Sequence, residues 1–339
     1  MKYLYILVSD NTDYYLEQAL LSITSLKIQM PNAFVTLLVD DITETNLVNE
    51  RAEIKKIVNE FKSIKIETQF NKKARSRWLK TSMRQHISDN FLYIDNDTII
   101  ADDLSSVENF NIDLGGVLDE HMYLSEFEAL RPVRMHEIKE MFKRRKFNME
   151  FDFKIYFNGG VFFTRDNQKS CDFFSEWHRL WLHCFNLNEL TDQPSLNQSN
   201  YNLGNIISEL DGTWNCQILD DGAIRFLSDA KIIHYFATQP ARKTYLPANN
   251  EFFKIIHETG KISSNITDML QTPKALFSEN TRLMLVDKSL REFYDSALCN
   301  AAKRIYFSKA GNTMEFVFAG IKKHIFSPLK RKLSSRNKK

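Results

Sequence analysis

The sequence predicts an α/β fold with a mostly parallel central sheet. Short apolar runs, which are typical of buried strands, alternate along the chain with segments whose apolar residues recur at helical spacing. A strand, helix, strand order of this kind places successive strands in parallel within one sheet. The 339 residues are enough to bury a large core, and no apolar run approaches the length of a membrane span.

The elements of the first hundred residues follow this alternation. Apolar runs predict strands at residues 3–8, 34–39 and 64–67, and amphipathic patterns predict helices at 14–28, 45–61 and 75–87. The next strand, residues 91–94, ends in Asp95, Asn96 and Asp97. Ligands of such sheets bind at the carboxyl ends of the strands. We therefore expect this acidic motif to lie at one edge of the sheet, together with the turn at residues 9–13 that follows the first strand.

The rest of the chain continues the pattern with more variation. Strands are predicted at 113–118, within 156–163 and at 230–236, a charged loop and helix at 120–150, and helices at 167–185 and from 192. The adjacent glycines Gly159 and Gly160 indicate either a β-bulge or a close approach of the backbone to a ligand. Asp192, followed by Pro194, is typical of an aspartate that caps a helix. The expected organisation is an α/β domain at 1–245, a C-terminal helical region at 246–320 and a basic tail at 321–339.

The acidic motif is the strongest indication of chemistry. An unpaired charge at the end of a buried strand is costly to desolvate unless a positive charge compensates it. Carboxylate oxygens at this position suit Mn²⁺ or Mg²⁺, and such an ion could hold a diphosphate. The chain has neither a G-x-G-x-x-G motif nor a Walker loop after its first strand, so phosphates would need the positive charge that a metal supplies. The alternative is that Asp95 and Asp97 are turn residues, a position that aspartate favours without any ligand.

The charge of the chain is distributed unevenly. The last eighteen residues hold eight of the 45 Lys and Arg but none of the 43 Asp and Glu, so the rest of the chain is net acidic. Apolar residues between these cations indicate an amphipathic segment that rests on an anionic membrane surface. A solvated, disordered end is the alternative. We do not expect nucleic acid binding, because the acidic body would repel the phosphate backbone and no recognition motif is present.

The cysteines indicate the compartment. Cys171, Cys184, Cys216 and Cys299 lie far apart and form no C-x-x-C pair. This spacing favours neither a zinc site nor a disulfide framework, so a reducing cytosol is expected. Together with the basic tail, it predicts a cytoplasmic protein that is peripheral on the inner face of the membrane.

The ordered set of motifs resembles glycosyltransferase family 8, a group of retaining enzymes that includes the bacterial lipooligosaccharide galactosyltransferases. The motifs are the Asp10 turn, Asp95-Asn96-Asp97, Phe157-Asn158-Gly159-Gly160-Val161, Asp192-Gln193-Pro194-Ser195-Leu196-Asn197 and Ile233-His234-Tyr235. The resemblance covers roughly residues 1–245 and implies a GT-A fold, which is a Rossmann-like nucleotide-binding unit. It also implies a UDP-sugar donor held through Mn²⁺ or Mg²⁺ and a glycan or lipid-linked saccharide acceptor.

The resemblance assigns roles to residues at the matching positions. It makes Asp95, Asp97 and His234 the metal ligands. It places Asp192 and Gln193 beside the anomeric carbon of the donor sugar. The remaining contacts that it implies are with the donor or acceptor: Asp10 and Asn11 at uracil or ribose, Arg77 at the sugar or diphosphate, Asn96 at the donor between the two acidic ligands, Asn158 and Gly159 at the sugar hydroxyls, and Asp119 at the sugar or acceptor.

Two positions depart from the family pattern. After the histidine the family usually has a glycine followed by Lys-Pro-Trp, whereas this chain reads Phe236-Ala237-Thr238-Gln239-Pro240-Ala241-Arg242-Lys243. The phosphate-binding lysine is therefore missing from its place, and Arg242 and Lys243 are the candidates to replace it. Pro194 takes the place of the family's second acidic residue after the glutamine. These departures indicate a divergent subfamily or a different donor sugar.

The sequence thus predicts a metal-dependent, retaining hexosyltransferase that acts in cell-surface polysaccharide synthesis. Retention requires either a double displacement through a nucleophile such as Asp192 or a same-face attack with polar support from Gln193, and we favour the second. A nucleotidyltransferase that makes nucleotide-sugars is one alternative, but it should carry a glycine-rich basic loop where residues 9–13 are acidic and free of glycine. A non-catalytic sugar-binding module with the same fold is another, and the missing lysine favours it.

Overall fold

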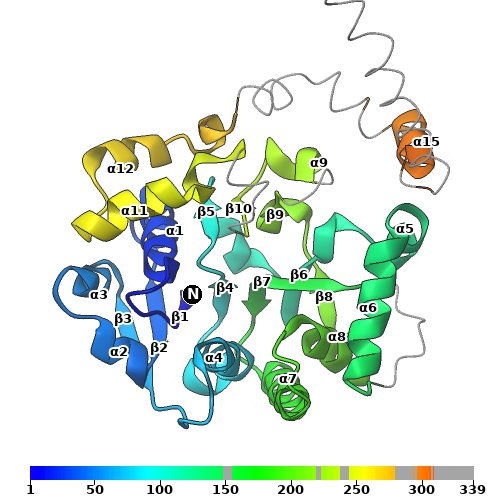
Figure 1. The fold of residues 1–339 in the computed structure, drawn as a ribbon, viewed down its shortest axis with the longest axis horizontal. Coiled ribbons are helices and arrows are strands. Elements are labelled where there is room, and N and C mark those ends of the chain that lie inside the picture. The colour runs from blue at the N-terminus through cyan, green and yellow to red at the C-terminus, as the bar shows by residue number, and fades with distance from the viewer. Residues whose placement is uncertain are drawn as a thin grey trace, which may run out of the picture.

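The computed structural model describes residues 1–147, 155–218, 223–236, 244–278 and 296–306, together with Phe293 and Ser308. Its centre is a seven-stranded sheet in the order β3-β2-β1-β4-β7-β6-β8 (Figure 1). These strands are β1 (Lys2–Leu7), β2 (Val35–Asp40), β3 (Glu60–Ile64), β4 (Phe91–Ile94), β6 (Leu114–Leu118), β7 (Phe157–Thr164) and β8 (Ile207–Glu209). Within this sheet only β7 runs antiparallel to its neighbours. The mostly parallel sheet predicted from the sequence is therefore confirmed.

Helices cover both faces of this sheet. One face carries α1 (Tyr15–Gln29), α11 (Asn250–Thr259) and α12 (Ser264–Leu270), and the other carries α4 (Lys72–His86), α7 (Gln168–Asn186) and α8 (Gln193–Asn202) (Figure 1). Alternate residues of each strand divide between the two layers. Tyr5 and Leu7 of β1 join the core beneath α1, whereas Leu4 and Ile6 join the aromatic core beneath α7. Burial on both faces explains why these strands read as continuous apolar runs.

The helix predicted at residues 45–61 is wrong, and so are the bounds of the strand predicted at 64–67. The structure has three short helical segments, α2 (Asp41–Asn46), η1 (Asn49–Glu53) and α3 (Ile54–Ile57), before β3. Asp40 accepts a hydrogen bond from the Thr43 backbone N–H, which starts the first segment early. Asn49 has a positive φ of 51°, which interrupts the helix. β3 is an edge strand with half-buried side chains, so its pairing with β2 decides its position more than its apolar pattern does.

A pair of helices, a second small sheet and several short helical turns complete the described fold. The charged segment predicted as a loop and a helix forms two helices, α5 (Leu124–Leu130) and α6 (Pro132–Arg144). A second sheet joins β5 (Thr98–Ile100), β10 (Ile232–His234) and β9 (Cys216–Gln217). Because β10 pairs antiparallel with β5, His234 lies opposite Thr98 and next to the acidic motif. The short helical turns are η2 (Ser105–Asn109), η3 (Asp119–His121), η4 (Gly212–Asn215), α9 (Ile224–Leu227), η6 (Leu246–Ala248) and η7 (Pro273–Leu276).

The C-terminal region is helical where the structure describes it. α11 and α12 contact α1, and α15 (Ala297–Tyr306) contacts α5. The basic tail at 321–339 lies outside the described residues. In the described part of the chain, no helix is both long enough and apolar enough to cross a membrane. The side chains of Cys171, Cys184, Cys216 and Cys299 are free thiols in the structure.

Candidate active site

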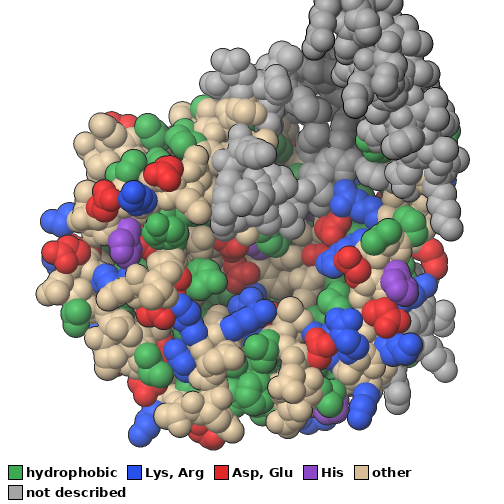
Figure 2. Space-filling view, in the orientation of Figure 1, with side chains coloured by type: hydrophobic (Ala, Val, Ile, Leu, Met, Phe, Trp, Pro, Cys, Tyr) green, Lys and Arg blue, Asp and Glu red, His purple; other side chains and the backbone are tan. Residues whose placement is uncertain are grey.

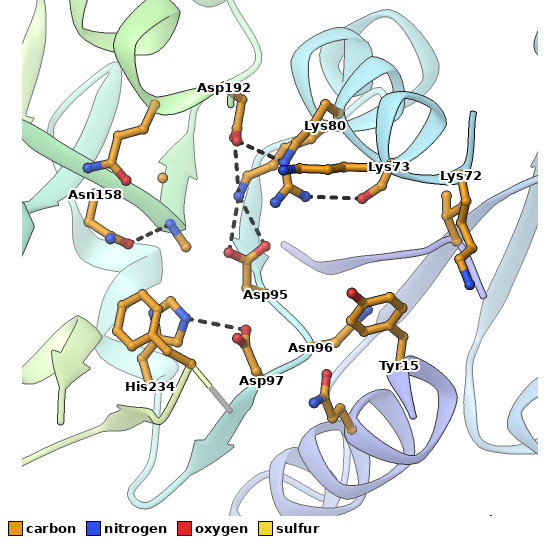
Figure 3. Close-up of a pocket in the computed structure, with 18 residues that line it drawn as sticks. Tyr15, Lys72, Lys73, Lys80, Asp95, Asn96, Asp97, Asn158, Asp192 and His234 are labelled. Atoms are coloured by element: carbon orange, nitrogen blue, oxygen red, sulfur yellow. Dashed lines mark hydrogen bonds and ion pairs between the residues drawn. The ribbon is translucent and has the colours of Figure 1, made fainter. Parts of the chain in front are cut away.

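A cavity of about 460 Å³ opens at the carboxyl ends of β1 and β4, where the sequence predicted a ligand site (Figure 3). Figure 2 shows the hollow in this face of the molecule, where acidic and basic side chains meet. Nine of the residues that the resemblance singled out line it: Arg77, Asp95, Asn96, Asp97, Asn158, Gly159, Asp192, Gln193 and His234. The fold therefore brings together side chains from α4, the turn between β4 and β5, β7, α8 and β10.

Asp10 and Asn11 lie outside the cavity wall. The Asp10 carboxylate pairs at 2.9 Å with Nζ of Lys72, which is itself a lining residue, so Asp10 stands at the margin of the cavity. The Thr12 hydroxyl and the Lys72 ammonium hold the pKa of Asp10 well below its usual value. Asn11 is exposed beside it. Their contact with uracil or ribose stays a prediction.

Asp119 lies behind the cavity wall. One of its carboxylate oxygens accepts a hydrogen bond from Asn158 Nδ2 at 3.0 Å, and the other pairs with Arg134 at 3.0 Å. It therefore holds the Asn158 side chain in place, and its contact with a sugar or an acceptor stays a prediction. Arg242 and Lys243, the candidates for the phosphate contact, lie outside the described residues.

Three side chains in the cavity form a candidate metal site. Ligand atoms of Asp95, Asp97 and His234 all lie within 4.8 Å of one another. His234 Nε2 is 3.3 Å from Asp97 Oδ1. Burial by itself would raise the pKa of Asp97, but the interaction with His234 holds it below its usual value. Carboxylate oxygens with an imidazole nitrogen are a donor set that suits Mn²⁺, so these residues fit the divalent ion that the resemblance implies.

Asn215 sets the orientation of the His234 ring, and the sequence analysis did not identify it. Asn215 Nδ2 donates to Asn158 Oδ1 at 3.0 Å, so the Oδ1 atom of Asn215 faces His234 Nδ1 at 2.9 Å. An acceptor at that distance requires a hydrogen on Nδ1. The other ring nitrogen, Nε2, is then directed to Asp97 and the cavity. Buried partners of this kind fix the tautomer of metal-binding histidines.

We expect Asn215→Leu to weaken Mn²⁺ binding about tenfold, because His234 loses the partner that fixes its ring. Isothermal titration with Mn²⁺ measures the affinity, and ¹⁵N NMR of the imidazole reports which ring nitrogen carries the hydrogen. Asn215→Asp keeps an acceptor at the same place and is the control that should retain the Nδ1–H form. An Asn215→Leu variant that folds and binds Mn²⁺ as tightly as the wild type would contradict this role.

Asp192 belongs to the cavity and does not cap the helix that it precedes. Its side chain accepts no hydrogen bond from the first turn of α8, so the predicted capping role is wrong. Instead Oδ1 lies 2.9 Å from Arg77 Nε, and Oδ2 lies 3.5 Å from Lys80 Nζ. Burial by itself would raise the pKa of Asp192, but the charges of Lys80 and Arg77 hold it below its usual value. Asp192 is therefore an ionised carboxylate held between two cations.

α4 lines the cavity with a cationic face. Lys73, Arg77 and Lys80 follow one another at intervals of four and three residues, which places them on one side of a helix. Only Arg77 was predicted. The helical spacing of the three cations is present in the sequence and is the signal that could have found the other two.

The two glycines of β7 have different surroundings. The register between β7 and β6 shifts beside them, so the strand pairing is irregular where a bulge or a close backbone approach was expected. A Cβ atom on Gly160 would lie 2.3 Å from His234 Cε1, so His234 occupies its place only because Gly160 has no side chain. A Cβ atom on Gly159 would meet Asp192 and Lys80 at an ordinary 3.7 Å. Gly160 is thus needed for packing, whereas Gly159 leaves room in the cavity.

Comparison with solved structures finds glycosyltransferases. The bifunctional glycosyltransferase WbbM has a TM-score of 0.50 at 15% identity, over 80% of this chain and 51% of that chain. The galactosyltransferase LgtC, solved with donor and acceptor sugar analogues, has a TM-score of 0.47 at 15% identity, over 78% of this chain and 98% of that chain. The glycosyltransferase GlyE of Streptococcus pneumoniae TIGR4 has a TM-score of 0.47 at 17% identity, over 81% of this chain and 64% of that chain.

Comparison with protein families gives a single assignment. No curated protein matches the chain, but the family described as "Glycosyl transferase family 8" matches residues 6–240, which is more than half of it. This match confirms the predicted GT-A fold and decides for a glycosyltransferase over a nucleotidyltransferase or a non-catalytic module. The chain belongs to glycosyl transferase family 8 and is a glycosyltransferase.

Proposed function

We propose that the protein is a metal-dependent, retaining hexosyltransferase that moves a hexose from a UDP-sugar to a glycan or lipid-linked saccharide in cell-surface polysaccharide synthesis. The observation that carries this proposal is the convergence of Asp95, Asp97 and His234 with the cationic face of α4 in one cavity. A nucleotide-sugar donor needs both oxygen ligands for a dication and basic groups for its diphosphate. Residues 1–245 would form the catalytic domain and 246–320 a helical extension.

Different residues of the cavity would have different roles in sugar transfer. Asp95, Asp97 and His234 would hold Mn²⁺ or Mg²⁺, which when bound supplies Lewis-acid stabilisation of the leaving diphosphate. Arg77 is held by Asp192 at the cavity wall, where it can meet the sugar or the diphosphate. Asn96 anchors the acidic turn, because its Nδ2 donates to the Ile6 carbonyl oxygen at 2.8 Å, and it lines the cavity where the donor would bind.

The electrostatics of the site favour a same-face attack over a double displacement. Arg77 Nε lies 2.9 Å from Asp192 Oδ1, and this ion pair lowers the nucleophilicity of the Asp192 carboxylate. Gln193 is uncharged, opens α8 and lines the cavity, so its amide dipole can stabilise an oxocarbenium-like state without forming a bond. In a same-face attack the departing phosphate oxygen takes the proton of the acceptor hydroxyl, and no protein base is required.

Isothermal titration of UDP with and without Mn²⁺ tests this proposal. We expect UDP to bind about tenfold more tightly when Mn²⁺ is present, since both ligands share one site and favour each other. A hydrolysis screen of UDP-Glc, UDP-Gal and their N-acetyl forms then identifies the donor sugar. UDP binding that does not respond to Mn²⁺, combined with no hydrolysis of any of these donors, would refute the proposal.

We propose in addition that the basic tail at residues 321–339 holds the enzyme on the inner face of the membrane. Its eight Lys and Arg are interleaved with apolar residues and follow a net acidic body. Each cation near an anionic leaflet contributes about 1 kcal/mol of attraction, before the entropy of ordering the segment is subtracted. This proposed membrane contact is supported by the amino-acid sequence of the tail.

Deleting residues 321–339 should abolish cosedimentation with phosphatidylserine vesicles and spare UDP-sugar hydrolysis. Transfer to acceptors embedded in the same vesicles should fall, because the enzyme no longer concentrates at their surface. High salt should release the full-length protein in the same way, since the attraction is electrostatic. If the truncated protein still binds these vesicles as well as the full chain, the tail is not the membrane contact.

A further inference from the structure

The ammonium group of Lys80 lies in the middle of the acidic cluster. Its Nζ is 3.1 Å from each carboxylate oxygen of Asp95 and 3.5 Å from Asp192 Oδ2 (Figure 3). The Tyr93 hydroxyl donates a hydrogen bond to the same Asp95 carboxylate. Only 5% of the Lys80 side chain is exposed. Without any ligand, the charge of Asp95 is therefore already compensated from within the protein.

In this arrangement Lys80 competes with a metal ion for the carboxylate of Asp95. Asp95 is one of the three candidate ligands, so a dication on its oxygens would stand beside the ammonium of Lys80. Two positive charges this close repel each other strongly in a partly buried site. Binding of the ion therefore favours a move of the Lys80 ammonium away from Asp95. Lysine carries its charge on a flexible four-carbon stem, which allows the ammonium to move.

The cavity offers Lys80 a second partner. No side chain closes the space next to it at Gly159, where a Cβ atom would lie 3.7 Å from both Cε and Nζ of Lys80. Lys73 and Arg77 stand on the same face of α4, so the three cations form one surface for an anionic diphosphate. The chain also lacks the phosphate-binding lysine that the family pattern places after His234. Lys80 can supply that positive charge from α4.

We propose that Lys80 is an exchangeable counter-ion of the active site. In the free enzyme it neutralises Asp95, and when the metal ion and the donor bind, its ammonium moves from Asp95 to the diphosphate. The inference rests on the proposed function, because it requires a metal ion and a UDP-sugar in this cavity. Its consequence is cooperativity: the metal ion binds weakly alone and more tightly with the nucleotide, which draws Lys80 away from Asp95.

Binding of Mn²⁺ and UDP to variants of the full chain tests this exchange. Lys80→Gln removes the charge but keeps a hydrogen-bond donor for Asp95. We expect it to bind Mn²⁺ alone about tenfold more tightly than the wild type, and UDP in saturating Mn²⁺ about tenfold more weakly. Lys80→Arg keeps the charge and should retain the weak binding of Mn²⁺ alone.

Lys73→Gln is the matched control on the same helix face. Lys73 lines the cavity, but it makes no ion pair with the described residues. Its substitution should lower UDP affinity and leave the affinity for Mn²⁺ alone within about twofold of the wild type, because Asp95 keeps its lysine. This pattern separates competition for Asp95 from a general loss of positive charge in the cavity.

Two results would overturn the role of Lys80. If folded Lys80→Gln binds Mn²⁺ alone no more tightly than the wild type, Lys80 does not compete for Asp95. If its UDP affinity in saturating Mn²⁺ is unchanged, Lys80 does not meet the diphosphate. Thermal unfolding without ligands shows whether the variant is folded, and Lys80→Met provides the same comparison should Lys80→Gln fail to fold.

The same titrations distinguish this inference from the proposed function. A wild-type protein whose UDP binding is insensitive to Mn²⁺ refutes both. Alternatively, the wild type binds Mn²⁺ and UDP cooperatively and Lys80→Gln shows the same cooperativity. That result refutes the exchange of Lys80 but remains consistent with the proposed metal-dependent glycosyltransferase.

Discussion

Asp97→Ala is expected to lower sugar transfer about a thousandfold while leaving the fold intact. Asp97 is a candidate metal ligand, and its loss removes stabilisation of the leaving diphosphate worth about 4 kcal/mol in the transition state. Its side chain is 28% exposed, and its ion-pair partner in the described structure is His234, so little packing depends on it. Turnover at saturating UDP-sugar measures the effect. Near wild-type turnover in this variant would show that the metal assignment is wrong.

Asp95→Ala should lose the same activity and also stability. Lys80 is almost fully buried and pairs with Asp95, so removal of the carboxylate leaves a buried ammonium whose remaining ion-pair partner among the described residues is Asp192, at 3.5 Å. We expect a loss of about 2 kcal/mol in the free energy of unfolding, because breaking a buried pair is costly but one partner remains. Adding Lys80→Met to Asp95→Ala should restore stability without restoring transfer. A double variant as unstable as Asp95→Ala would argue against the buried pair as the cause.

Gly160→Ala is expected to lower both stability and sugar transfer, although it removes no side chain from the site. The new Cβ atom would lie 2.3 Å from His234 Cε1 and 2.9 Å from Asn158 Oδ1, and both side chains are buried and hydrogen-bonded. One of them must shift, which should cost about 1 to 3 kcal/mol of stability. Because His234 is a candidate metal ligand, transfer should fall about a hundredfold. Thermal unfolding measures the loss of stability, and turnover at saturating UDP-sugar measures the loss of transfer.

Gly159→Ala is the matched control for this prediction. Its Cβ atom would meet Asp192 and Lys80 at 3.7 Å, which is ordinary contact, so the free energy of unfolding should change little. UDP-sugar affinity should still fall, because the methyl group occupies space in the cavity. If Gly159→Ala destabilises the protein as much as Gly160→Ala, the loss reflects general sensitivity of β7 and not the contact with His234.

Local patterns were sufficient to predict much of the fold and part of the site. Several elements lie close to their predicted positions, namely strands β1, β2 and β4 and helices α1, α4 and α7. Each is either a continuous apolar strand or an amphipathic helix, and the spacing of its apolar residues can be recognised within a short stretch of sequence. The acidic motif lies at a strand end, as the local pattern predicts, and nine residues that the family resemblance singled out line the cavity. The helix predicted at 45–61 failed where a cap at Asp40 and a positive φ at Asn49 outweighed its apolar spacing.

By itself the sequence determined the order of strands and helices, the acidic turn and the family, because these depend on neighbours along the chain. The tertiary structure alone decided which partners the charged groups of the site have. Lys80 and Asp95 are 15 residues apart, and Arg77 meets Asp192 only because α4 and α8 pack on the same face of the sheet. His234 receives its orientation from Asn215 because η4 lies beside β10. Such pairings depend on how the helical layers pack and how the strands align. The local spacing of apolar residues in the sequence therefore does not predict them.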